Sequence, residues 1–192
     1  MSKDFARFIN ETDAVLRGDF TLKNGTKSNI FFNFGNICCG RQMYTLGTYY
    51  AELILDNELY EKGDTIFGPA YKGIPIVSST SDALFTNLSH SVPFAYNRKT
   101  TKAHGETGNF IGYDLNKAKG VIVVDDVLTD GGTKLEVMDM LSQFPNIKIK
   151  AFIVGIDRQE KNENGEFCID VFRRKTGIPT YALTTKEEIL NI

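Results

Sequence analysis

One segment, residues 120 to 133, constrains the fold more than any other part of the chain. It reads GVIVVDDVLTDGGT, in which an apolar run is followed by the adjacent carboxylates Asp125 and Asp126 and then by a glycine-rich loop. Beyond the loop, apolar residues recur at the spacing of one helix face. The pattern predicts a buried strand over 121–124 that carries two acids at its carboxyl end, just before a turn and the start of a helix.

The two acids and the loop behind them favour a binding site for a phosphorylated sugar. The first N–H groups of a helix have no intrahelical partner and attract anions such as phosphate. Carboxylates repel a phosphate but suit sugar hydroxyls or a metal ion, and two like charges side by side repel each other unless something binds them. The alternative is an ordinary strand, an Asp- and Gly-rich turn and a helix, which is common in α/β proteins.

Strands and helices alternate through most of the chain, which predicts an α/β fold with a central, mostly parallel sheet flanked by helices. Further strands are expected at 65–67, 92–97, 149–156 and 179–183, and helices at 42–56, from the 68–73 loop to about residue 88, at 166–175 and at 184–192. Near the N-terminus, a helix is expected to include Val15 and Leu16 and to stop at Gly18. The dipeptide Asn24-Gly25 then predicts a hairpin turn. Ligands of such sheets lie outside the carboxyl ends of the strands, so several of these loops should carry site residues.

Composition and length point to one intracellular domain. The chain has 192 residues and a net charge of −2, which gives no sign of a nucleic-acid partner. No apolar stretch approaches the roughly 20 residues that span a bilayer, and the polar start MSKDFARFINETD does not resemble a secretory signal. The cysteines Cys38, Cys39 and Cys168 lack the spacing of a disulfide framework or a metal site, so we expect reduced thiols in a cytoplasmic protein.

Two other loops that follow predicted strands carry positive charge. In GPAYKG, Lys72 lies just before a helix, where a cation is unfavourable unless an anion such as pyrophosphate is also present. In RKTTKAHGETG, a run of basic residues includes Arg98, Lys99, Lys102 and His104. This loop is placed to close over a diphosphate as a lid and to neutralise the leaving charge. The alternatives are a solvated lysine in a turn and a solvated charged surface.

The segment at 120–133 resembles the signature with which type I phosphoribosyltransferases bind 5-phosphoribosyl diphosphate (PRPP). Four more segments occur in the order seen in orotate phosphoribosyltransferases, namely FFNFG at 31–35, PAYKG at 69–73, RKTTKAHGE at 98–106 and DRQE at 157–160. The resemblance implies the type I phosphoribosyltransferase fold over 1–192, with a small hood formed by residues 1–40 and part of the C-terminus. It also implies a pentosyltransferase that converts orotate and PRPP to orotidine 5′-phosphate and pyrophosphate in pyrimidine biosynthesis.

The resemblance further implies roles for individual residues. The residues implied in catalysis are Lys72, Lys102, His104, Asp125 and Asp126. PRPP would be bound by Tyr71, Lys72, Arg98, Lys99, Lys102, His104, Asp125, Asp126, Val127, Leu128, Thr129, Asp130, Gly131, Gly132 and Thr133. Orotate would be bound by Lys23, Phe31, Phe32, Thr129 and Arg158. The planar guanidinium of Arg158 suits the carboxylate of orotate.

Three of these assignments have alternatives. Successive strand residues point to opposite faces, so one of Phe31 and Phe32 is expected in the core. Asp130 stands where such loops often carry a small neutral residue, so its side chain must point outward or bond its own backbone. Arg158 has the alternative of an ion pair with Asp157 or Glu160.

The resemblance also implies Mg²⁺, held mainly by substrate oxygens and water, with no direct protein ligand assigned. It implies a homodimer in which loop 98–108 serves the neighbouring subunit's site, and neither a nucleic-acid nor a membrane partner. Two competing hypotheses are a phosphoribosyltransferase for another base and a non-catalytic regulator that senses PRPP.

Overall fold

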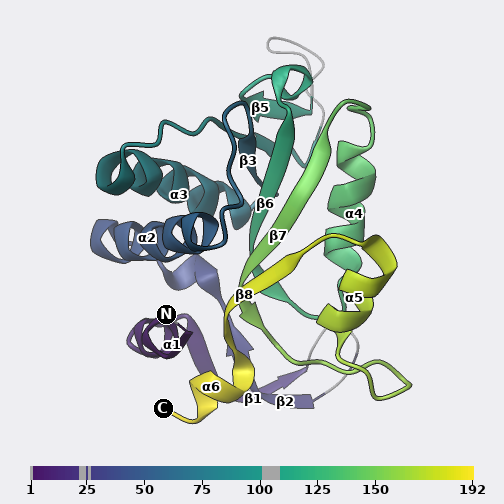
Figure 1. Cartoon of the computed structure of the whole chain (residues 1–192). Helices are drawn as coiled ribbons and strands as arrows, with labels where there is room; N and C mark the ends of the chain where they lie inside the picture. The colour runs from purple at the N-terminus through teal and green to yellow at the C-terminus, as the bar shows by residue number, and fades with distance from the viewer. Residues whose placement is uncertain (1, 22–24, 26, 101–108) are drawn as a thin grey trace.

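The computed structural model describes residues 2–21, 25, 27–100 and 109–192. A central β-sheet forms the middle of the described structure (Figure 1). Its strand order is β5-β4-β3-β6-β7-β8. The strands are β3 (Thr65–Gly68), β4 (Phe94–Asn97), β5 (Phe110–Gly112), β6 (Gly120–Leu128), β7 (Lys148–Asp157) and β8 (Thr180–Thr185). Neighbouring strands pair in parallel except β4 and β5, which are antiparallel. The prediction of a mostly parallel sheet is confirmed.

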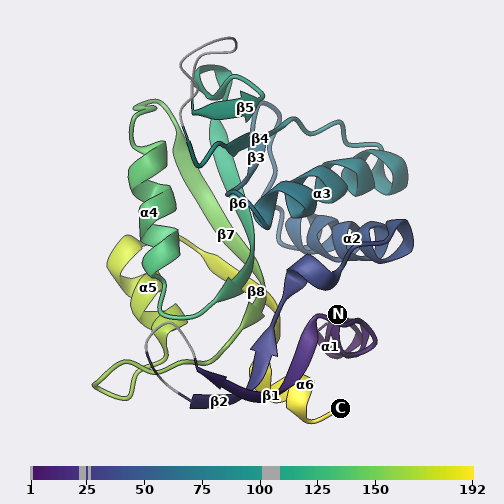
Figure 2. The same cartoon turned by 180° about the vertical axis from the view of Figure 1, so that it is seen from behind.

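Helices cover both faces of this sheet. The helices α2 (Gly40–Asp56) and α3 (Gly73–Leu88) lie on one face, and α4 (Gly132–Leu141) and α5 (Cys168–Thr176) lie on the other (Figures 1 and 2). Short 3-10 turns occur at Phe34–Asn36 and Leu115–Lys117. Within the described ranges, no helix has the length and apolar character needed to cross a membrane.

Strand β6 shows how the sequence pattern builds a core on each face. Ile122 and Val124 belong to the cluster that includes residues of α2 and α3. Val121 and Val123 belong to the cluster that includes residues of α4 and α5. Because successive strand residues point to opposite faces, a strand covered by helices on both sides needs a continuous apolar run. The strand continues past the predicted 121–124 to Leu128 and still pairs with β7 there, so the two acids lie within it rather than after it.

The two ends of the chain meet at one end of the molecule (Figure 1). The elements there are α1 (Ser2–Asn10), β1 (Val15–Thr21), β2 (Lys27–Phe32) and α6 (Lys186–Leu190). Strands β1 and β2 form an antiparallel two-stranded sheet, which confirms the predicted hairpin. Glu188 of α6 accepts a hydrogen bond from the hydroxyl of Ser2 and so ties α6 to α1.

The N-terminal helix is shorter than predicted. It ends at Asn10, and Val15 and Leu16 begin strand β1, where they pair with β2. The prediction of a helix reaching Gly18 was wrong, because a short apolar pair fits one face of a helix and a strand equally well. The buried hydroxyl of Thr12 donates to a carbonyl of the last helical turn at 2.8 Å and helps to end the helix there.

Candidate active site

The carboxyl ends of four neighbouring strands, β4, β3, β6 and β7, meet at one edge of the sheet. Buried Asn97 at the end of β4 accepts a hydrogen bond from the N–H of Ala70 at 2.8 Å and so holds the loop after β3. The N–H of Arg158, after β7, donates to the carbonyl of Leu128 at the end of β6 at 3.1 Å. Hydrogen bonds therefore connect the end of β4 to the loop after β3, and the segment after β7 to the end of β6.

The loop between β3 and α3 packs so closely that only glycine fits at both of its ends. A Cβ on Gly68 would lie 2.1 Å from the carbonyl oxygen of Gly73, and a Cβ on Gly73 would lie 2.7 Å from the carbonyl carbon of Gly68. These clashes are with backbone atoms, so no side-chain rotation relieves them. The two glycines thus fix the position of Tyr71 and Lys72 at the N-terminus of α3.

The two adjacent acids face opposite sides of the sheet, and each meets a lysine. On the α3 side, Lys72 Nζ lies 3.0 Å from Asp126 Oδ2. On the α4 side, Lys134 Nζ lies 2.7 Å from Asp125 Oδ2. The alternation of a β-strand produces this separation, as it does for the apolar residues before the acids. The structure brings Lys72 and the acid pair together, as the sequence predicted.

The contact between Lys72 and Asp126 is open to solvent. The side chain of Lys72 is 42% exposed and that of Asp126 is 15% exposed. The second oxygen of Asp126 accepts the N–H of Val127 at 2.7 Å, which orients the carboxylate. Water screens a half-exposed ion pair and leaves it weak. The two partners can therefore separate when an anion takes the lysine and hydroxyl groups take the acid.

The contact between Lys134 and Asp125 is shielded from solvent. Lys134 is 2% exposed, and its Nζ also donates to the carbonyl of Val127 at 2.7 Å. Asp125 Oδ1 accepts the N–H of Asp126 at 2.9 Å, and the hydroxyl of Tyr50 donates to the carbonyl of Asp125 at 2.7 Å. Burial raises the pKa of the Asp125 carboxyl, and the ammonium of Lys134 opposes that rise. Burial, together with the two nearby acids, also raises the pKa of Tyr50 well above its ordinary value.

Sequence reasoning missed both Lys134 and Tyr50. A signal for Lys134 was present, because it stands in the first turn of α4, where the helix dipole disfavours a cation. The same argument had selected Lys72. Tyr50 gives no such signal, since it lies among the apolar residues of α2 and its partner is 75 positions away in the sequence.

Backbone conformation and hydrogen bonds at the N-terminus of α4 determine the shape of the loop between β6 and α4. Gly131 has φ of +86°, a left-handed conformation that favours glycine. Asp130 Oδ1 accepts the N–H of Gly132 at 2.9 Å, which confirms the alternative in which this acid bonds its own backbone. The side chain of Leu128 is fully buried, so this residue can meet a ligand only through its backbone.

The start of the basic loop lies beside the loop after β3. Lys99 Nζ is 5.9 Å from the centre of the Tyr71 ring, and Tyr71 is 69% exposed. The N–H of Arg98 donates to the carbonyl of Asn109 at 2.7 Å, where the described chain resumes. Three residues of the predicted site lie outside the described residues: Lys23, Lys102 and His104.

Arg158 is buried at the end of β7 and is paired with Glu160. Its guanidinium lies 3.2 Å from Glu160 Oε1, and its Cζ is 5.9 Å from the centre of the Phe32 ring. The ion-pair alternative is therefore correct for Glu160 but not for Asp157, which accepts the N–H of Gln159 at 2.8 Å. Glu160 contacts Nη2, whereas the buried Nε makes no hydrogen bond within the described structure. A ligand that carries a carboxylate could therefore take Nε directly and would take Nη2 in exchange for Glu160.

A pocket of about 260 Å³ opens beside Arg158. Its other lining residues come from the loop after β7 and from the C-terminal end of the chain: Gln159, Lys186, Glu187, Leu190 and Asn191. The pocket thus places Arg158 at a surface opening, although the guanidinium itself is buried.

The two phenylalanines of β2 divide between core and surface. Phe32 is buried in the core, whereas half-buried Phe31 lies against Phe20 with ring centres 5.6 Å apart. The prediction that one of the pair belongs to the core is confirmed. Phe31 is the one whose ring remains available for contact with a ligand.

In the part of the chain that the structure describes, no cluster of three His, Cys, Asp or Glu side chains is placed to hold a metal ion. Magnesium prefers oxygen ligands and readily keeps water or substrate phosphates among them. A Mg²⁺ ion at this edge of the sheet would take most of its ligands from a diphosphate substrate and from water.

Comparisons with known proteins agree with this geometry. Residues 40–178 match the phosphoribosyl transferase domain family. An orotate phosphoribosyltransferase of Clostridium beijerinckii is 37% identical over 188 residues, which cover 98% of this chain and 84% of that protein. The enzyme of the same name from Saccharophagus degradans is 38% identical over 189 residues, with 98% and 86% covered. The crystal structure of orotate phosphoribosyltransferase from Francisella tularensis matches with a TM-score of 0.80 at 36% identity and covers 98% of this chain and 88% of that one. The chain therefore has the type I phosphoribosyltransferase fold and belongs to the orotate phosphoribosyltransferase family.

Proposed function

We propose that this chain transfers the phosphoribosyl group of PRPP to a ring nitrogen of orotate, which gives orotidine 5′-phosphate and pyrophosphate in pyrimidine biosynthesis. The observation that carries the proposal is the 3.0 Å contact between Lys72 and Asp126. It places a cation suited to a diphosphate beside an acid suited to ribose hydroxyls, at the edge of the sheet where such folds bind ligands. The identity to relatives named orotate phosphoribosyltransferases supports orotate as the acceptor.

Three segments of the site would bind different parts of PRPP. Lys72 would leave Asp126 for the diphosphate, and Asp126 would accept hydroxyl groups of the ribose. The loop from Thr129 to Thr133 would bind the 5′-phosphate, because the first N–H groups of α4 follow directly behind it. Binding energy from this remote phosphate fixes the position of the reacting carbon.

Orotate would bind from the side of β7 and the hairpin. Its carboxylate suits the buried guanidinium of Arg158, whose Nε makes no hydrogen bond within the described residues and whose Nη2 would exchange Glu160 for the substrate. The half-buried ring of Phe31 offers an apolar surface to the flat pyrimidine.

The reaction needs stabilised charges rather than a protein nucleophile. A nitrogen of the orotate ring supplies the electron pair for the new bond to the anomeric carbon and gives up its proton to pyrophosphate or water. The bond from that carbon to the diphosphate breaks, with its electrons leaving on pyrophosphate. Positive charge grows on the ribose beside Asp125 and Asp126, and negative charge leaves beside Lys72. Lys99, Lys102 and His104 are the further groups that we assign to the leaving diphosphate.

Magnesium, the homodimer and the cytoplasmic location are further parts of the proposal. Mg²⁺ bound to the diphosphate would supply charge neutralisation. Loop 98–108 would act in the neighbouring subunit's site, as the family resemblance implies. Cys38 and Cys39 are exposed, Cys168 is buried, and all three are free, which suits a reducing compartment.

A direct assay tests the function. The purified chain is mixed with orotate, PRPP and Mg²⁺, the loss of orotate absorbance is followed, and the same mixture without PRPP is the control. Uracil, adenine, hypoxanthine and guanine replace orotate in parallel reactions. Turnover of another base in place of orotate would make the chain a different phosphoribosyltransferase, and PRPP binding without turnover of any base would make it a sensor.

A further inference from the structure

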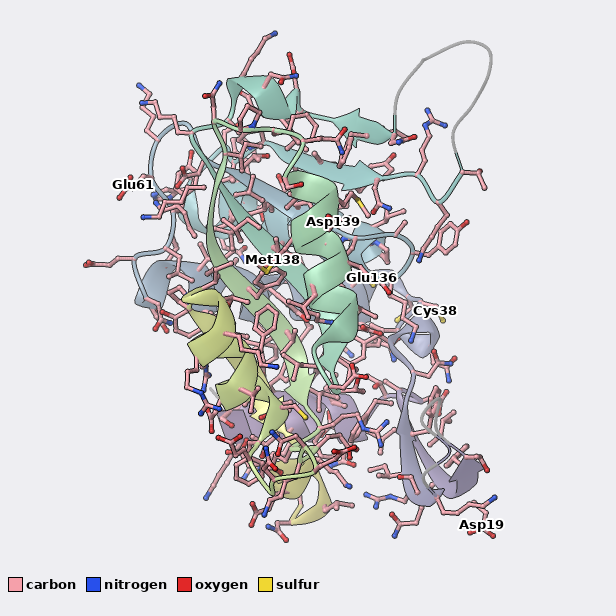
Figure 3. The ribbon with its side chains drawn as sticks, turned by 90° about the vertical axis from the view of Figure 1, so that its right-hand side faces the viewer. Asp19, Cys38, Glu61, Glu136, Met138 and Asp139 are labelled. Atoms are coloured by element: carbon pink, nitrogen blue, oxygen red, sulfur yellow. The ribbon has the colours of Figure 1, made fainter. Side chains whose placement is uncertain are left out.

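Lys134 is a buried cation in a place where a cation is not expected. It lies in the first turn of α4, at the end of the helix that carries a partial positive charge. Lysine is almost never fully buried unless it is paired, yet this side chain is 2% exposed. Figure 3 views α4 from outside, where Glu136 and Asp139 are exposed, whereas Lys134 belongs to the buried side of the helix with Val137.

The ammonium of Lys134 joins the two ends of the loop that follows β6. Its Nζ donates to Asp125 Oδ2 at 2.7 Å, to the carbonyl of Val127 at 2.7 Å and to the hydroxyl of Thr133 at 3.4 Å. An ammonium has three donors, so all of them are used. Asp125 and Val127 precede the 129–133 loop, and Thr133 is its last residue. The ammonium therefore fixes the distance between the two ends of the loop.

We propose that Lys134 is a positioning residue for phosphoribosyl transfer: it holds the carboxylate of Asp125 and the 129–133 loop in the geometry that binds PRPP, without itself touching the substrate. The inference rests on the proposed function. Lys134 is too buried to reach a ligand, so its effect passes through Asp125 and the loop.

The structure supports an effect on PRPP rather than on orotate. The acceptors of Lys134 lie at the end of β6 and at the start of α4, whereas Arg158 and its pocket lie beyond β7. Among the described residues, the other charged or titratable groups found to act on Asp125 or its neighbours are Asp126 with its partner Lys72, and Tyr50. None of these replaces the ammonium, because Lys72 is engaged on the opposite face and the hydroxyl of Tyr50 donates to the backbone carbonyl of Asp125 rather than to its carboxylate.

The test compares kinetic constants for the two substrates in Lys134→Met and Lys134→Gln. We expect kcat/KM for PRPP to fall by about 10- to 100-fold in Lys134→Met, by analogy with residues that orient metal ligands through hydrogen bonds, whose loss costs about that much. The KM for orotate at saturating PRPP should change much less than kcat/KM for PRPP, because of the residues assigned to orotate only Thr129 belongs to the 129–133 loop. Calorimetry with PRPP alone should give weaker binding, which measures the effect without catalysis. Lys134→Gln keeps hydrogen-bond donors at this position without the charge, and should show the same selective loss at a smaller size.

Lys150 offers a matched control. Its Nζ lies 2.8 Å from buried Asp64, a distance like that of the proposed pair, but near the amino end of β7, away from the site. Lys150→Met should lower the melting temperature and leave kcat and both KM values unchanged.

The results of these experiments distinguish a failure of the proposed function from a failure of the positioning role. An inactive wild-type chain in the orotate assay would refute the proposed function itself. If the wild type is active and both Lys134 variants keep wild-type constants for PRPP, the positioning role is wrong. That role is also wrong if the variants only melt at a lower temperature, as Lys150→Met should. It is wrong too if neither variant folds, because Lys134 would then serve stability only.

Discussion

Replacing Arg158 by alanine tests the acceptor side of the site. The Nε of the buried guanidinium makes no hydrogen bond within the described residues, and its Nη2 contacts only Glu160 among the ion pairs found there. A hydrogen bond to a charged group contributes about 1.5–3 kcal/mol, and each 1.4 kcal/mol is a factor of ten in affinity. We therefore expect Arg158→Ala to raise the KM for orotate by about 10- to 100-fold. The KM for PRPP should remain near the wild-type value, because Lys72 and Asp126 are untouched.

The neighbouring acid provides the control for this experiment. Glu160 lies 3.2 Å from the guanidinium and competes with a substrate carboxylate for it. Glu160→Gln removes the competing charge but keeps an oxygen that can accept a hydrogen bond. The KM for orotate in this variant should therefore stay the same or fall.

Initial rates with one substrate varied and the other saturating give both KM values, and thermal melts check that the variants are folded. Equal damage to the KM of orotate and of PRPP in Arg158→Ala would mean that Arg158 is structural. A rise in the orotate KM of Glu160→Gln as large as that of Arg158→Ala would refute the reasoning too, because the ion pair with Glu160, and not donation from the guanidinium to orotate, would then be what matters.

Three other predictions address catalysis, stability and pH. Lys102→Ala should lower kcat far more than it weakens PRPP binding, by roughly 2.7–4 kcal/mol in activation free energy as for other lost transition-state contacts, and single-turnover rates beside PRPP titrations check this. Tyr50→Phe removes the hydrogen bond to the carbonyl of Asp125 and should destabilise the fold by about 1–2 kcal/mol, or about 2–8 °C in melting temperature, whereas Tyr49→Phe should melt like the wild type. Burial alone would raise the pKa of Glu188, but hydrogen bonds from neighbouring hydroxyl and N–H groups lower it below its ordinary value of 4.5, so the stability that this carboxylate contributes is present above that value and is lost as the pH falls through the lower, folded-state pKa. Melting curves taken between neutral and acid pH should show this loss in the wild type and a smaller one in Glu188→Gln.

Local patterns were sufficient to predict most of the sheet and its helices. The apolar runs of β6 and β7 and the helix period after the glycine-rich loop each depend on neighbours within a few positions, so they can be read from the sequence. Strand β5 was not predicted, because Phe110–Gly112 is too short to show a period and pairs in antiparallel fashion at the edge of the sheet. The end of α1 was misplaced for a similar reason, since Val15 and Leu16 are too few to distinguish a helix from a strand.

The geometry of the site was predicted less completely than the fold, because it depends on contacts between segments that are far apart in the sequence. The sequence indicated that Lys72 and the acids belong together, because several loops at the carboxyl edge of one sheet carried charge. It could not indicate that Tyr50 reaches the carbonyl of Asp125, or that Glu160 rather than Asp157 pairs with Arg158, since these choices depend on how the helix and the loop pack.

The adjacency of Asp125 and Asp126 has a different consequence from the one the sequence suggested. Two neighbouring like charges indicated one common ligand, but the pleat of the strand sends them to opposite faces, where each meets its own lysine. The difference between the two pairs that matters most here is exposure: Lys72 is 42% exposed and Lys134 is 2% exposed. Only the exposed pair can exchange its partners for substrate groups without uncovering a buried charge. A strand covered on both faces thus turns two identical acids into one that can change partners and one that stays fixed, and this difference is the physical basis for expecting Lys72 and Lys134 variants to fail in different ways.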